Sequence, residues 1–479
     1  MLHLIVISIY LFVLIGLGVY KSVSIKTQAD FSVAGRSLTP WVLVGTMLAT
    51  WIGTGSVLGN AGKTYETGMA ALMLPLGGVL GIFLLTKIAG KVRSFEKFTV
   101  PEILGERYGT ETRILSVIAL VMAYMVIVSY QYNAGGAVLT TVLTDANGDA
   151  LISAQTGTII AAVFIVAYTM LAGLVSVAYT DVGNGIIMTI SLIIAFPILW
   201  MKAGGWTGME VAFTNMGHPE KMQFFGRYST MDIINFCLPS FLLVLGDANM
   251  YQRFFASKDA DGATKATTVL VVFVLIIELL IIANAWVSSS MITDAANGKH
   301  VLIYASHQIL PPLLGAIMMT TIVGIIISTA DSFLLVPATT LIRDVYLQYV
   351  DPDADEKKIV LLSRALVLVL GIIAYVVSLG FAKSAGFFEK ALYAYTIYGA
   401  AITPVLVAAL FWKKASKVGA IISIVSGTMT TLMWKEADFI RNVIPAEIYS
   451  SMDEVLPAIT ISVIGLVVGS LWFPDKNNQ

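Results

Sequence analysis

The sequence predicts an all-α, polytopic membrane protein with thirteen transmembrane helices. Composition is the first reason: of 479 residues, 57% are hydrophobic and 12% are charged, with a mean hydropathy of +0.84. Soluble domains carry about a quarter charged residues. The second reason is that apolar runs long enough to cross a bilayer, about 20 residues, recur along the chain. Short connections separate them, so we expect one membrane domain.

The thirteen expected spans follow one another from the N-terminus, and only residues 174–181 separate the fifth from the sixth. They cover residues 2–20, 41–66, 69–90, 112–143, 156–173, 182–202, 231–252, 266–290, 310–344, 358–381, 390–412, 417–435 and 454–473.

The spans divide into an extra first helix, two repeats and a C-terminal pair. The run 2–20 has neither a basic leader nor a small-residue cleavage site, so we interpret it as a retained helix. The irregular second and seventh spans lie five apart, and five helices followed by five of opposite sense form an inverted repeat. We expect the repeats at 41–202 and 231–412, and two further helices within 417–473.

Basic residues in the connections predict the orientation. Twenty of the 29 Lys and Arg residues, Arg253 among them, fall on one side of this topology. Basic residues concentrate on the cytoplasmic side. We therefore expect the N-terminus outside, the C-terminus in the cytoplasm, and a multi-pass protein of the plasma (inner) membrane.

Several function classes are disfavoured. A net charge of −1 gives no indication of a nucleic-acid partner, and the single Cys237 excludes a multi-cysteine metal site. The sequence contains no Gly-x-x-x-x-Gly-Lys-Ser/Thr loop, and the connections are too short for a catalytic domain, so we expect no enzyme. The chain ends at Gln479, soon after its last span, so we expect no signalling output domain. No obligate protein partner is implied.

The ninth span carries an unusual polar stretch, from Ser328 to Ser332. Polar and charged groups at bilayer depth are costly and usually face the protein interior. Ser328, Asp331 and Ser332 share one helix face, and converging oxygen ligands suit a hard cation such as Na⁺. The alternative is that the hydroxyls pack between helices and that Asp331 pairs with a base.

The second span contains a stretch that favours a break, from Ala49 to Ser56. Gly53 and Gly55 each cost a helix about 1 kcal/mol, and broken helices in transporters free carbonyls for ions and solutes. The alternative is close helix packing through Gly55 and Gly59, which does not explain Trp51 among the glycines.

Three further carboxylates lie in or beside spans. Asp181 is at the start of the sixth span, and Glu278 is in the middle of the eighth, where the sequence offers it no obvious partner. Asp247, near the end of the seventh, is either functional or a helix-end group paired with Arg253.

Four motifs together resemble the sodium/solute symporter family, locally its choline and proline members. They are Ala49-Thr-Trp-Ile-Gly53, Ser176-Val-Ala-Tyr-Thr-Asp181, Tyr251-Gln-Arg253, and Ser328-Thr-Ala-Asp-Ser332 with Arg343-Asp-Val-Tyr346. The resemblance covers nearly the whole chain. It implies a LeuT-type core of ten helices and an alternating-access cycle that couples a small solute to Na⁺, without an organic cofactor.

The resemblance also implies a first sodium site. In the family, carbonyls at the break of the first core helix face a carbonyl and two hydroxyls on the eighth. Carried onto this sequence, the ligands are Ala49, Ile52, Ile325, Ser328 and Thr329.

A second sodium site, found in some members, maps onto Asp181, Ser328 and Ser332. Asp331 stands where some relatives have Ser. Its carboxylate would strengthen cation binding, hold a proton, or form a salt bridge.

For the solute we expect an amine, such as an amino acid, because a carboxylate at Asp247 would attract its ammonium group. Trp51 fits one wall of an aromatic box for a quaternary ammonium. However, Gly78 replaces another aromatic, and Asp247 stands where choline carriers have a second tryptophan, so the box for choline is incomplete. The expected solute contacts are Trp51, Gly53, Ser56, Tyr130, Gln131 and Asp247.

We therefore predict a Na⁺-coupled importer of an amine-bearing solute. Within the same class, a carboxylate, a sugar or a quaternary ammonium solute is the alternative. From another class, a transporter-like membrane sensor is the alternative.

Overall fold

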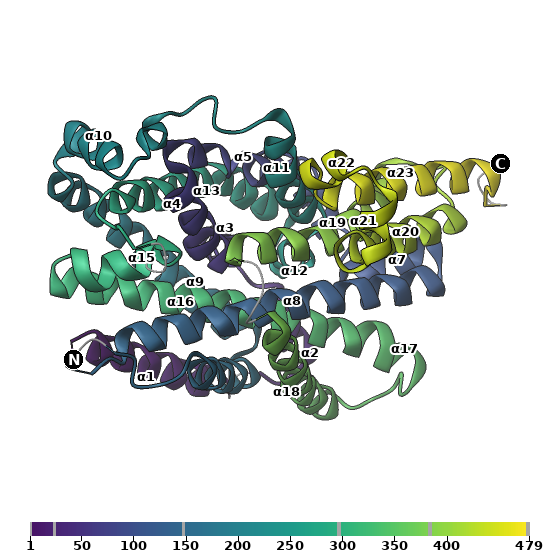
Figure 1. The fold of residues 1–479 in the computed structure, drawn as a ribbon. Coiled ribbons are helices and arrows are strands. Elements are labelled where there is room, and N and C mark those ends of the chain that lie inside the picture. Colours follow the sequence, from purple (N-terminus) through teal and green to yellow (C-terminus); the bar gives the residue numbers. More distant parts are fainter. Residues whose placement is uncertain (1, 23–24, 146–148, 295–297, 382–385, 476–479) are drawn as a thin grey trace.

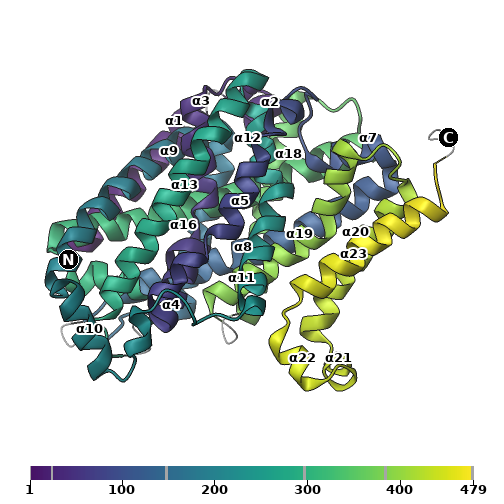
Figure 2. The same cartoon turned by 90° about the horizontal axis from the view of Figure 1, so that it is seen from above.

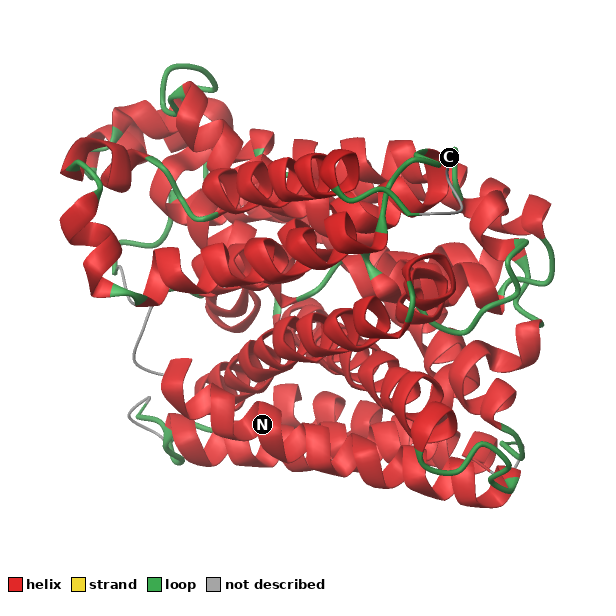
Figure 3. Cartoon of the chain, turned by 90° about the vertical axis from the view of Figure 1, so that its right-hand side faces the viewer, coloured by secondary structure: helices red, strands yellow, loops and turns green. Residues whose placement is uncertain are grey.

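The computed structural model describes residues 2–22, 25–145, 149–294, 298–381 and 386–475, and these form helices and loops (Figure 3). Within these residues, ten helices are long and apolar enough to cross a membrane, or eleven if one bent pair counts as a span. In Figures 1 and 2 the two chain termini lie toward opposite ends of the molecule. The predicted all-helical, polytopic architecture is confirmed, whereas the count of thirteen is not.

The longer helices and three shorter ones pack side by side. They are α1 (Leu2–Ser22), α3 (Pro40–Trp51), α5 (Leu76–Leu85), α8 (Thr110–Val142), α9 (Ala154–Lys202), α11 (Thr230–Gly246), α12 (Ala248–Ala256), α13 (Ala260–Ser289), α16 (Pro312–Thr340), α18 (Glu356–Phe381), α19 (Phe387–Phe411), α20 (Lys417–Glu436) and α23 (Val455–Trp472). The three shorter ones are α3, α5 and α12.

Short helices connect them at the two ends. They are α2 (Gln28–Val33), α4 (Ala61–Thr67), α6 (Ala89–Arg93), α7 (Val100–Tyr108), α10 (Gly205–Asn215), α15 (Val301–Tyr304), α17 (Leu347–Tyr349), α21 (Asp438–Val443), α22 (Ala446–Ser451), with turns η1 (Ala34–Arg36), η2 (Gly55–Asn60), η3 (Gly68–Met73), η4 (Pro219–Met222), η5 (Ala305–Ile309) and η6 (Leu341–Tyr346).

Two regions explain the lower count of spans. The expected fifth and sixth spans are joined in α9, because the residues expected between them are also helical; only Gly173, with a φ of 55°, departs from helical geometry. The expected third span, 69–90, is divided into η3, the ten-residue α5 and the loop before α6, so no single helix there is long enough.

Both helices expected to be irregular are interrupted. After Trp51 the chain leaves α3 and continues into η2 at an angle of 50°. The second interruption is at Asp247, whose φ of −58° and ψ of 109° end α11 and begin α12. Backbone groups at such ends lack helical partners. These two breaks position the residues of the candidate site.

Candidate functional site

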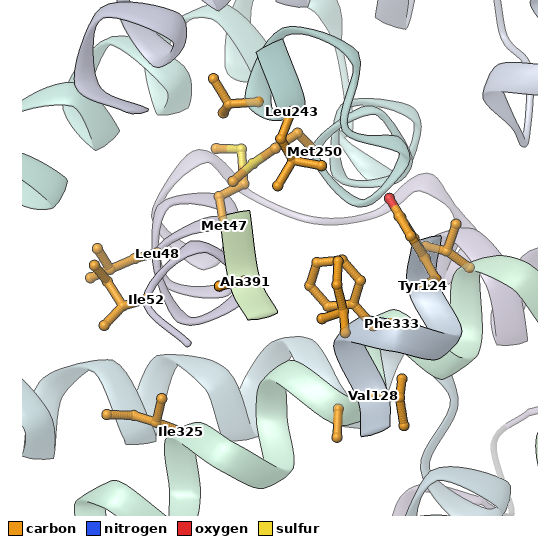
Figure 4. Close-up of a cluster of buried hydrophobic side chains, with 14 of the residues drawn as sticks. Met47, Leu48, Ile52, Tyr124, Val128, Leu243, Met250, Ile325, Phe333 and Ala391 are labelled. Atoms are coloured by element: carbon orange, nitrogen blue, oxygen red, sulfur yellow. The ribbon is translucent and has the colours of Figure 1, made fainter. Parts of the chain in front are cut away.

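The break in α3 lies against the polar stretch of α16. A Cβ atom added to Gly53 would come within 3.0 Å of the Thr329 side chain, so the two helices approach closely there. Figure 4 shows Leu48 of α3, and Ile52 just after that helix, near Ile325 of α16. They lie at one end of a buried apolar cluster that has Tyr124 and Phe333 at its other end.

The interruption leaves backbone carbonyls outside the helical pattern. The N–H of Ile52 donates to the Leu48 carbonyl at 2.8 Å, and the next bonds run from Ser56 and Val57 to the Gly53 carbonyl, at 3.1 and 3.0 Å. The carbonyls of Ala49 to Ile52 therefore fall in the gap between two helical segments. Freed carbonyls of this kind can bind a cation.

Thr329 faces this gap with an unused hydroxyl. Its side chain is buried, with 3% exposed, and among the described residues its Oγ1 has no hydrogen-bond partner. A buried hydroxyl without a partner costs about 1–3 kcal/mol, so an unpartnered one in a native fold suggests a missing ligand. The predicted first-site residues Ala49, Ile52, Ile325, Ser328 and Thr329 are all buried, and all offer oxygen ligands. Their chemistry fits Na⁺.

Asp181 connects three helices beside this set. Its carboxylate accepts hydrogen bonds from Thr46 on α3, at 2.6 Å, and from Ser328 on α16. The predicted pair Asp181 and Ser328 is thus in direct contact. Thr46 is a partner that sequence reasoning missed, although it and Thr50 lie four residues apart on one face of α3.

The other two residues of the predicted second site have different partners. Asp331 accepts a hydrogen bond from Thr169 on α9. Ser332 accepts one from Arg253 Nη2 at 2.6 Å and lies 3.5 Å from the Thr50 hydroxyl. Within the described residues, these hydrogen bonds connect neither residue to Asp181.

Arg253 is the clearest departure from the sequence interpretation. It was placed among the cytoplasmic basic residues, yet it is fully buried and also donates to Asn249 and Gln252, at 3.3 and 3.2 Å. Asp247 is not its ion-pair partner within the described chain. Instead, Asp247 accepts from the Tyr124 hydroxyl at 2.6 Å and from the Asn249 N–H at 3.1 Å.

On the other side of the α3 break is a small cavity of about 30 Å³. Trp51 and Ser56, both predicted solute contacts, line it, together with Glu278 and the rings of Phe236 and Tyr395. Gly78 lines it too. A Cβ atom on Gly78 would come within 2.3 Å of the Trp51 ring. The glycine that seemed to remove an aromatic wall thus makes room for Trp51.

The remaining predicted solute contacts do not line this cavity. Gly53, Tyr130, Gln131 and Asp247 are buried. Gln131 accepts a hydrogen bond from Thr54, and the partners of Asp247 are given above.

Glu278, for which the sequence offered no partner, accepts hydrogen bonds from Ser56 at 2.5 Å and Asn60 at 3.1 Å. Both donors belong to η2, the segment that follows the break. Only the fold could bring them to α13, more than 200 residues away.

A much larger vestibule adjoins the cavity at Phe388, which lines both. Its volume is about 860 Å³, and Lys63, Lys299 and Gln155 are among its lining residues. These lie on the side predicted to be extracellular. On the predicted topology, the vestibule would join the outside to the cavity beside Trp51 and Glu278.

Comparison with known proteins identifies related chains. A model described as "Sodium:solute symporter family" matches residues 31–427. The high-affinity proline transporter PutP of Bacillus subtilis (strain 168) is 26% identical over 90% of this chain and 92% of its own length. The osmoregulated proline transporter OpuE of the same organism is 24% identical, over 97% and 93%. The sodium/proline symporter of Staphylococcus aureus is 23% identical, over 96% and 90%.

Solved structures show the same fold. A Na⁺-coupled sialic acid symporter in a substrate-bound, outward-open state has a TM-score of 0.81 and 15% identity, over 99% of this chain and 98% of that one. MhsT in complex with L-phenylalanine has a TM-score of 0.57 and 14% identity, over 90% and 97%.

Proposed function

This chain belongs to the sodium:solute symporter family, and from that premise we propose that it imports proline or a close analogue together with Na⁺. The curated relatives that match over nearly their whole length are proline transporters. The family couples transport to Na⁺, and the chain is a transporter, not an enzyme. Our proposal needs no organic cofactor.

One observation carries the proposal. The broken helix α3–η2 contacts Thr329 with one side and lines the small cavity with the other. An ion held at the break and a solute held by Trp51 and Ser56 would therefore share one structural element. Binding of either would order that element for the other, which is the physical requirement for coupling two ligands.

We assign the ion to the carbonyls of Ala49, Ile52 and Ile325 and the hydroxyls of Ser328 and Thr329. The gap in the helical bonding and the unpartnered Thr329 hydroxyl support this assignment. A bound Na⁺ would hold α3 against α16. A Na⁺ that enters down a potential of 100 mV contributes about 2.3 kcal/mol, besides its concentration gradient.

A second cation site at Asp181, Ser328, Asp331 and Ser332 remains a proposal. Its support is the pair of buried carboxylates and the Asp181–Ser328 hydrogen bond. To form it, Ser332 would have to exchange its bond from Arg253 for the ion.

We further propose the thirteen-span topology, with α9 crossing as two spans that meet near Gly173 and with 69–90 crossing as an interrupted span. The first repeat would then cover 41–202 and the second 231–412. The N-terminus would be outside, the C-terminus cytoplasmic, and the protein would reside in the plasma membrane.

The test is uptake of radiolabelled L-proline by proteoliposomes, with an inward Na⁺ gradient compared with an inward K⁺ gradient. We expect accumulation only with Na⁺, and its collapse when a sodium ionophore is added. Equal uptake with both ions, or no Na⁺-dependent uptake of any amino acid in a panel, would contradict the proposal.

A further inference from the structure

Glu278 is a buried carboxylate that the sodium sites do not use. It lies in the middle of α13, with 3% of its surface exposed, and it lines the cavity beside Trp51. Its carboxylate accepts hydrogen bonds from the Ser56 hydroxyl and the Asn60 side-chain amide, both neutral. None of the ion pairs recorded within the described parts of the chain includes Glu278.

The two hydrogen bonds leave acceptor positions on the Glu278 carboxylate unused, and they do not neutralise its ionised form. An ionised carboxylate offers about four acceptor positions, and each oxygen here accepts from one donor. Neutral donors solvate a carboxylate but do not cancel its charge, and burial of an unpaired charge is costly. The free acceptor positions adjoin the cavity, so a cation entering it would meet them.

The aromatic walls of the cavity also favour a positively charged ligand. Trp51, Phe236 and Tyr395 line the cavity, and ring faces attract cations, by about 2 kcal/mol where water is excluded. The described residues that line it include no Lys or Arg. An anionic group placed there would meet Glu278 without a compensating base, whereas an ammonium group would be stabilised by the carboxylate and the rings.

We propose that Glu278 is the counter-charge for the ammonium group of the solute, which makes this carrier selective for amine-bearing molecules over isosteric carboxylates. The inference rests on the proposed function and assigns the amine contact within the same site. It replaces Asp247 in that role, because Asp247 is already held by Tyr124 and Asn249 and does not line the cavity.

The test compares two probes that differ in one ring atom. L-proline carries an ammonium and a carboxylate, whereas tetrahydrofuran-2-carboxylate has an ether oxygen in place of the ammonium. Binding of each to the purified full-length protein is measured by isothermal titration calorimetry in Na⁺ buffer. The variant is Glu278→Gln, which keeps the shape of the side chain. The matched control is Asp261→Asn, on the same helix, whose exposed carboxylate pairs with Lys265 at 2.5 Å.

The wild type and Asp261→Asn should bind L-proline at least 100-fold more tightly than the ether analogue. In Glu278→Gln, proline affinity should fall on the order of 100-fold, as expected for the loss of one partner of a buried charge pair. The ether analogue should bind equally well or better, because the repulsion of its carboxylate is removed. This opposite change distinguishes a charge contact from a general defect in folding.

Two outcomes would overturn the inference. Unchanged proline affinity in Glu278→Gln would remove the carboxylate from the solute contact. An equal loss for both probes would show a structural role only. If wild-type protein bound no amino acid in Na⁺ buffer, the proposed function itself would fail, and that result is separate because it appears before any substitution is made.

Discussion

Replacement of Thr329 by Val separates ion binding from folding. The substitution exchanges the unpartnered, buried Oγ1 for a methyl group of similar size. A hydroxyl buried without a partner costs about 1–3 kcal/mol. Without Na⁺, Thr329→Val should therefore be about 1 kcal/mol more stable than the wild type, although most core substitutions destabilise.

With Na⁺ the order should reverse. Loss of one of five proposed ligands should weaken ion affinity about tenfold, or about 1.4 kcal/mol. At a Na⁺ concentration 100 times the wild-type Kd, the ion stabilises the wild type by about 2.7 kcal/mol and a tenfold weaker variant by about 1.4 kcal/mol. The assay is thermal unfolding of the detergent-purified protein across a Na⁺ titration, with K⁺ holding the ionic strength constant.

The control is Thr320→Val on the same helix. Its hydroxyl donates to the Ala316 carbonyl at 2.8 Å, so its loss should leave the Na⁺ response intact without a gain in stability. The reasoning is refuted if Thr329→Val keeps the wild-type Na⁺ response, or if without Na⁺ it is less stable than Thr320→Val.

Two further predictions concern buried carboxylates outside the proposed ion and solute ligands. Asp247→Asn should lower stability by about 2 kcal/mol, because the charged acceptor of Tyr124 and Asn249 is lost. Calorimetry should find its proline affinity within about threefold of the wild-type value. A loss of affinity without a loss of stability would return Asp247 to the solute contact. Asp344→Asn removes a buried carboxylate that accepts from Thr99 at 2.7 Å and lies 3.6 Å from Arg113. On the predicted topology, this contact between the cap of α7 and η6 lies on the cytoplasmic side, so its loss should favour inward-facing molecules. Thr140 lines the vestibule. A membrane-impermeant maleimide should therefore label Thr140→Cys about threefold more slowly, in a Cys237→Ser background. Unchanged labelling would exclude this contact from gating.

The polar positions of the spans could be predicted from sequence because they violate the rules for lipid-facing helices. Ser328, Thr329 and Asp181 were identified in this way, and the structure buries all three in one region. The glycines at 53 and 55 predicted the break in the same manner. The resemblance to the sodium/solute symporter family is confirmed by the family match over residues 31–427.

The partners of the buried charges could not be predicted, because they depend on contacts between distant segments. Glu278 meets Ser56 and Asn60 only after η2 turns away from α3 by 50°. In the sequence, Arg253 directly follows the apolar run 231–252, which assigns it to the cytoplasmic connection. In the fold it belongs to α12, which begins after the break at Asp247 and is buried along its whole length.

The number of spans was difficult for a different reason. Hydropathy marks where apolar residues occur, but not whether the backbone hydrogen bonds continue between two apolar runs. Residues 174–181 are polar enough to suggest a loop, yet they are helical. Conversely, the apolar run at 69–90 contains Pro75 and four glycines, and its helix is only ten residues long.

The bond from Arg253 to Ser332 bears on how many ions are carried in each cycle. A guanidinium is a permanent positive charge, and it already occupies one oxygen of the proposed second site. Two unit charges 4 Å apart repel by about 4 kcal/mol at an effective dielectric constant of 20, so a second Na⁺ would have to displace Arg253 or do without Ser332. If the proposed second site exists, the Arg253 side chain would compete with its ion for Ser332. The number of ions carried in each cycle would then depend on the position of an arginine as well as on the number of carboxylates.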